Sequence, residues 1–185
     1  MDTGREWTLS EASRLLEAPQ HRLIHLCEKK VVVPDYGDAK GRGSSRLFSA
    51  RNLLEFALAL RLRELTIPVA TVAAIVHVLR GFEKTVAAHL GGFGLAEGLR
   101  RKGSPELRII ISDGEWLYFT LGLRGRQPRL FGGIDFRRLT KKGGRPRVME
   151  RDLASLEKFG GPEGSRYARV EIDVTRLARD LPLAS

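Results

Sequence analysis

Cysteine is nearly absent from this chain of 185 residues, whose one cysteine is Cys27. A single cysteine excludes an internal disulfide and any zinc or redox motif built on a Cys-x-x-Cys pair. Long apolar runs are also missing, since no uncharged stretch approaches the roughly 20 residues that a membrane-spanning helix needs. Residues 1–8 carry two acids and no apolar stretch of the signal-peptide type. We therefore expect a cytoplasmic protein with no membrane partner.

Groups that could perform catalysis are equally scarce. Asp113, Glu115 and Asp135 are scattered beside predicted turns, and no Ser/His/Asp or Cys/His set has surroundings that would activate a nucleophile. The glycine-rich residues 91–94 lack the preceding strand and the following Lys-Ser/Thr of a nucleotide phosphate loop. The sequence therefore predicts neither an enzyme nor a bound cofactor.

Basic residues, in contrast, are in excess. The chain has 32 Lys and Arg against 22 Asp and Glu, a net charge of +10 and a pI near 10.3. Most of this excess lies in residues 81–149, which hold 14 basic and 6 acidic side chains. Such a surface attracts polyanions, and nucleic acid is the favoured partner because no membrane-binding segment is evident.

The first 80 residues predict four helices interrupted by one loop. Apolar residues recur at helical spacing, and Thr8 and Ser49 are typical N-cap residues. The helices are expected from Leu9 to Leu16, from Pro19 to just before Val31, from Ser49 to Leu65, and from Pro68 through Leu79. Between the second and third helices, Asp35 to Ser45 is rich in Gly, Ser and basic residues, and Arg46-Leu47-Phe48 resembles a short strand.

The remaining residues predict short helices and a small sheet. A Ser112-Asp113-Gly114-Glu115 turn between two apolar runs is a hairpin signal. The expected helices are Glu83–Leu90, Leu95–Arg101, residues 150–158 and Thr175–Leu181, and the expected strands are Leu107–Ile111, Trp116–Leu121, Leu130–Ile134 and Tyr167–Val174. The strand aromatics Trp116, Tyr118 and Phe119 are interpreted as core residues in preference to a base-stacking platform.

Residues 7–80 resemble the DNA-binding domain of the MerR family of transcription regulators. Trp7 to Ala12 has the form of that family's opening helix. The family's Arg-Tyr-Tyr-Glu, spacer, Gly-Leu-Leu, Pro signature is similar to His25 to Pro34, which keeps the Glu, the apolar pair and the Pro but replaces the Arg and both Tyr. Arg46-Leu47-Phe48 followed by Asn52-Leu53 resembles the wing motif, and Pro68 lies where the family begins its second wing helix.

The resemblance implies a fold and a domain organisation. Residues 1–80 would form a mainly α winged helix-turn-helix that binds DNA. A helical linker over residues 81–103 and a small α+β domain over residues 104–185, with an antiparallel or mixed sheet, would follow it and serve for dimerisation, effector binding or partner binding. Gly91 to Gly94 interrupts the place where sensors of this family have a long dimerisation helix.

It also implies a function and candidate contacts. The chain would be a sequence-specific regulator that binds pseudo-palindromic double-stranded DNA as a homodimer and distorts a promoter so that RNA polymerase can engage. A recognition helix reads base edges with its N-terminal half, while a basic wing contacts phosphates. The candidate residues are Gln20, His21, Arg22 and His25 on the helix, Lys40, Arg42, Ser44 and Arg46 on the wing, and Lys141, Lys142, Arg145 and Arg147 around a Gly-Arg-Pro core that resembles a minor-groove AT-hook.

Other interpretations remain open at this stage. His21 and His25 with Cys27 and Glu28 have metal-ligand residue types, but polar DNA-facing histidines beside a small buried thiol suit a recognition helix better. The chain could instead be an architectural or mobile-element accessory protein of excisionase or partition type, which bends or coats DNA with little sequence preference. A third hypothesis is a protein-interaction module in which the winged helix is only a scaffold.

Overall fold

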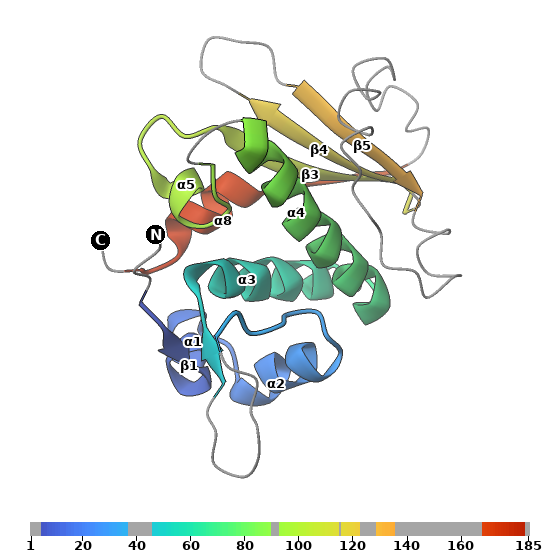
Figure 1. Cartoon of the computed structure of the whole chain (residues 1–185). Helices are drawn as coiled ribbons and strands as arrows, with labels where there is room; N and C mark the ends of the chain where they lie inside the picture. Colours follow the sequence, from blue (N-terminus) through green and yellow to red (C-terminus); the bar gives the residue numbers. More distant parts are fainter. Residues whose placement is uncertain are drawn as a thin grey trace.

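The computed structural model describes residues 5–36, 46–89, 93–114, 116–122, 129–135 and 168–183. Within them the chain forms six helices and two antiparallel sheets, which confirms a mixed α and β fold. Figure 1 shows helices α1, α2 and α3 on one side of the long helix α4, and the larger sheet on its other side. Among the helices of these residues, none is long and apolar enough to cross a bilayer.

The N-terminal elements are β1 (Trp7–Thr8), α1 (Leu9–Leu15), α2 (Gln20–Glu28) and β2 (Leu47–Phe48). Thr8 caps α1, as expected from the sequence, and forms a capping box with Glu11. β1 pairs antiparallel with β2, with Trp7 opposite Phe48. The sequence did not predict β1, because two residues are too few to show a period of alternation.

The next two helices are α3 (Ala50–Glu64) and α4 (Val69–His89). Ser49 caps α3, as predicted. The prediction of a separate helix beginning at Glu83 is wrong, because α4 runs through this region without a break. Leu79, Phe82 and Val86 are all buried at helical spacing and extend the stripe that begins at Val72, so packing sustains the helix.

The C-terminal elements are α5 (Glu97–Arg100), β3 (Glu106–Ser112), β4 (Trp116–Gly122), β5 (Arg129–Asp135), β6 (Arg169–Asp173) and α8 (Val174–Asp180). The strand order is β5-β4-β3-β6, with every pair antiparallel. Asp113 and Gly114 have φ of 53° and 66°, the conformation that the predicted hairpin turn requires. The last strand ends one residue earlier than predicted, because the Asp173 side chain accepts a hydrogen bond from the Arg176 amide and caps α8. The predicted helix over residues 150–158 lies outside the described residues.

One cluster of buried apolar side chains extends from Trp7 to Leu181. Helix α4 lies at its centre, since it packs against α3 on one side and places Phe82 against Phe119 of β4 on the other, with ring centroids 4.9 Å apart. Helix α8 contacts both α3 and β3. The predicted segments 1–80, 81–103 and 104–185 therefore share one core in their described parts. The boundaries between these segments stay a prediction.

Candidate nucleic-acid interface

Helix α2 has one buried side and one exposed side. Leu23 and Leu26 are buried and anchor the helix. The side chains expected to read DNA, those of Gln20, His21, Arg22 and His25, are all exposed. The helix therefore presents hydrogen-bond donors and acceptors on the side that its apolar anchors leave free.

A surface pocket of about 620 Å³ lies between this polar side of α2 and the C-terminal half of α3. Its lining combines the predicted His21, Arg22 and His25 with Leu60, Arg63 and Glu64 of α3. Arg63 is exposed and donates a hydrogen bond to the Ile67 carbonyl at 2.6 Å. Sequence reasoning missed Arg63, because nothing in a single sequence indicates that α3 runs beside α2.

Arg46 lies against α2. Burial raises the pKa of the Cys27 thiol, and a hydrogen bond and the positive charge of Arg46 partly offset that increase. The structure thus brings one predicted wing residue next to the predicted recognition helix. The other predicted phosphate contacts, namely Lys40, Arg42, Ser44, Lys141, Lys142, Arg145 and Arg147, lie outside the described residues.

Residues 33–36 and 46–49 lie on either side of residues 37–45 and include the ends of the predicted wing; we call them the neck. The two sides of the neck meet where the Leu47 amide donates to the Tyr36 carbonyl at 3.2 Å. The same two residues form an isolated antiparallel bridge. Tyr36 and Leu47 therefore hold the two sides of the neck together.

Hydrogen bonds with residues at the start of α3 hold the neck in place. The Ser49 hydroxyl donates to the Asp35 carboxylate, which joins the two sides of the neck a second time. Asn52, which is fully buried, accepts from the Asp35 amide at 2.9 Å and donates to the Val33 carbonyl at 3.0 Å. An amide side chain suits this position because it both accepts and donates.

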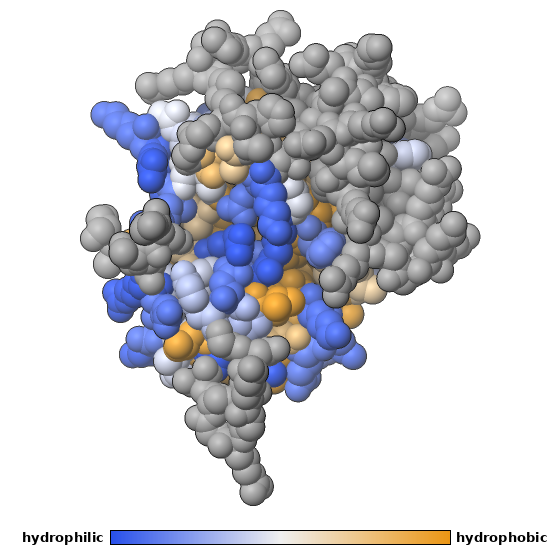
Figure 2. Space-filling view, viewed as in Figure 1, coloured by the Kyte–Doolittle hydropathy of each residue, from blue (hydrophilic) through white to orange (hydrophobic). Residues whose placement is uncertain are grey.

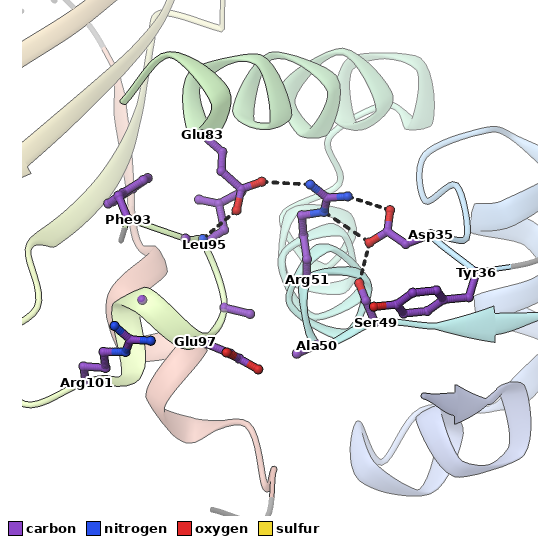
Figure 3. Close-up of a pocket in the computed structure, with 13 residues that line it drawn as sticks. Asp35, Tyr36, Ser49, Ala50, Arg51, Glu83, Phe93, Leu95, Glu97 and Arg101 are labelled. Atoms are coloured by element: carbon purple, nitrogen blue, oxygen red, sulfur yellow. Dashed lines mark hydrogen bonds and ion pairs between the residues drawn. The ribbon is translucent and has the colours of Figure 1, made fainter. Parts of the chain in front are cut away.

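A bridge of three charged side chains runs from the neck to helix α4 (Figure 3). Arg51 of α3 donates to Asp35 at 2.7 Å on one side and to Glu83 of α4 at 3.0 Å on the other. Glu83 also accepts a hydrogen bond from the Leu95 amide at 2.8 Å. Burial alone would lower the pKa of Arg51, but the two carboxylates raise it above its ordinary value, so Arg51 stays charged.

The pKa of Asp35 is shifted by two opposing effects. Burial raises it, whereas hydrogen bonds from Arg51 and Ser49 lower it, and the net result lies below the ordinary value. Asp35 is therefore an anion at neutral pH, which is the form that holds the two sides of the neck together.

Arg80 and Glu55 form a second, more deeply buried ion pair. Glu55 is 1% exposed, and Arg80 donates two hydrogen bonds to it. Burial raises the pKa of Glu55 above its ordinary value, and the contacts with Arg80 and Asn52 offset only part of this shift. Arg80 also donates to the Val33 carbonyl at 2.8 Å, so α4 contacts the neck directly.

The Arg51 bridge forms one wall of a second surface pocket, of about 640 Å³, between the start of α3 and residues 93–98 (Figure 3). In the view of Figure 2, hydrophilic residues lie in a band over the middle of the molecule, where Figure 1 shows α3 and α4. In the part of the chain that the structure describes, no three His, Cys, Asp or Glu side chains converge as metal ligands.

Compared with protein-family models and with curated proteins, the chain matches none. The resemblance to MerR regulators therefore rests on the residues quoted for it in the sequence.

Proposed function

We propose that this chain is a sequence-specific, DNA-binding transcription regulator of MerR type. Helices α1 and α2 would form the helix-turn-helix, and the neck with residues 37–45 would form the wing. The polar side of α2 would enter the major groove, where a helix can distinguish all four base pairs.

The observation that carries this proposal is the division of α2 into a buried and an exposed side. Leu23 and Leu26 attach the helix to the core, while the exposed side offers Arg22 and two histidines and also includes Ile24. Arg63 and Arg46, from other elements, add positive charge beside it. Cations that flank a helix with polar side chains suit a phosphate backbone on either side of a groove.

Selection from random duplex DNA, followed by binding of the selected site across a salt series, tests the proposal. We expect an inverted repeat to be recovered from wild type. Arg22→Ala should lose the preference for that repeat, because arginine is the commonest reader of guanine. Arg176→Ala is the matched control, since Arg176 is an exposed arginine on α8, and it should keep both affinity and preference.

Two other outcomes would select the alternative functions. Steeply salt-dependent binding without a recovered motif would favour an architectural protein that uses the basic residues 81–149 to coat or bend DNA. No binding at low salt would favour a protein-interaction module and would contradict the proposal.

A regulator that reads an inverted repeat should also be a dimer. Sedimentation of the protein alone and of its complex with the selected duplex measures this directly. Two chains per duplex are expected, and one chain per duplex would contradict the homodimer. Contact with RNA polymerase would follow only from an activating role on a promoter.

A further inference from the structure

The position of the neck depends on the Asp35 carboxylate, which is held by Arg51, a residue outside the neck. Asp35 accepts hydrogen bonds from Ser49 on the opposite side of the neck and from Arg51 on α3. Two Arg51 nitrogens, Nη2 and Nε, contact the two Asp35 oxygens at 2.7 and 3.2 Å. This bidentate contact fixes the orientation of the carboxylate as well as its distance.

Arg51 has a second contact that leads away from the neck. Its Nη1 donates to Glu83, whose other carboxylate oxygen accepts from the Leu95 amide. Leu95 is fully buried, and the neighbouring Phe93 ring lies edge-on to Phe82 in the core beneath the sheet. The planar guanidinium therefore links the neck to a segment that follows α4 in the sequence.

We propose that Arg51 is a positioning residue for the neck, and that through Glu83 it makes the position of the neck depend on residues 93–95. A shift of those residues would move Glu83, and the rigid Arg51 fork would pass the shift to Asp35. As far as DNA affinity is concerned, this inference rests on the proposed function. The coupling within the protein is independent of it.

The neck has other supports, so loss of the bridge should loosen it without unfolding the chain. Asn52 still bonds Val33 and the Asp35 amide, and Arg80 still bonds the Val33 carbonyl. Both belong to helices whose apolar sides are buried in the core. The bridge can therefore be tested by substitution at Glu83, which lies outside the neck.

Hydrogen exchange of the neck amides tests the coupling without DNA. In Glu83→Ala we expect the Leu47 amide to exchange at least about fivefold faster, because local opening near the neck becomes easier. Arg51→Lys should have the same effect, since an ammonium cannot hold two carboxylates in one plane. Glu64→Ala, which removes an exposed partner of Arg61, is the matched control and should leave the exchange unchanged.

Amides of the hairpin between β3 and β4 are the internal reference. If they accelerate as much as the Leu47 amide, the substitution has lowered global stability and the proposed coupling is wrong. The proposal is equally contradicted if Glu83→Ala accelerates exchange at Leu95 but not at Leu47.

Duplex binding across a salt series then separates this inference from the proposed function. A displaced neck should lose about one phosphate contact. The slope of log K against log salt should therefore become shallower by about 1 in Glu83→Ala, while the selected sequence stays the same. If the neck loosens but wild type binds no DNA, the coupling holds and the proposed function fails. If wild type binds its site and the neck is unaffected in Glu83→Ala, the proposed function holds and the coupling fails.

Discussion

The buried carboxylate of Glu55 depends on one cationic partner, Arg80. It is almost completely buried, and Arg80 supplies the charge that compensates it, with further help from Asn52. A buried carboxylate that loses its cation must either stay charged in a poor environment or take up a proton. Removing one partner of this ion pair should therefore destabilise the fold strongly. The intact pair itself adds little net free energy compared with apolar side chains of similar volume.

Substitution of this partner gives the first prediction. Arg80→Ala should lower the free energy of unfolding by about 3 to 5 kcal/mol, because it leaves Glu55 buried without its cation. Arg61→Ala, which breaks an exposed pair with Glu64, should cost less than about 1 kcal/mol. Urea denaturation of the two variants measures the difference, and equal losses would contradict the role of burial.

The depressed pKa of Asp35 gives a prediction about pH. A group whose folded pKa lies below its unfolded value contributes stability above the unfolded pKa, near 3.9, and loses it as pH falls through the folded pKa. The difference in unfolding free energy between wild type and Asp35→Asn should therefore shrink between pH 5 and pH 2. Denaturation at several pH values checks this, with Asp180→Asn, at an exposed position of α8, as the control. A difference that does not change with pH would show that Asp35 does not act through its charge.

At the scale of elements, local signals predicted most of the structure. Thr8 and Ser49 correctly predicted the starts of two helices, and Asp113-Gly114 correctly predicted the hairpin turn, because caps and turns depend on a few neighbouring residues. The length of α4 could not be predicted in the same way. Its continuity across Gly81 follows from burial of Phe82 against Phe119, a contact between distant parts of the chain.

The same limit applies to the candidate site. The exposed residues of α2 could be identified because the apolar Leu23 and Leu26 mark the opposite side of the helix. Arg63 and the Arg51 bridge could not, because their partners are brought together only by the packing of α3 against its neighbours. A charged residue considered alone in a sequence is predicted to lie on the solvated surface. Which charged residues form pairs becomes evident only in the folded structure.

The contact between α4 and the sheet gives a prediction at this scale. Phe82→Ala should lower the free energy of unfolding by about 3 to 5 kcal/mol, since it leaves a cavity against Phe119 and Phe93. Lys84→Ala on the exposed side of the same helix should change it by less than about 0.5 kcal/mol. Thermal and chemical denaturation of both variants measure these effects, and a small loss for Phe82→Ala would mean that the two aromatic rings contribute little.

At the scale of the whole molecule, the important feature is that one apolar cluster includes both the helical part and the sheet. A shared core favours unfolding in one cooperative step. We therefore predict that circular dichroism, which follows the helices, and Trp116 fluorescence, measured in a Trp7→Phe variant to report on the sheet, give the same denaturation midpoint. Two separate midpoints would show that the parts before and after α4 unfold independently.

Because α4 packs against both the N-terminal helices and the sheet, helices α1 to α3 cannot be exchanged as an independent unit. A segment cut after residue 80 and joined to a foreign partner would carry Val72, Ile75 and Leu79 but leave behind Phe82 and the strands that complete their surroundings. A successful graft must take the chain through His89 and either bring β3 and β4 with it or replace the uncovered apolar side of α4 with polar residues. Such a requirement would restrict how this chain could diversify by recombination, because a new C-terminal part must cover the same apolar side of α4.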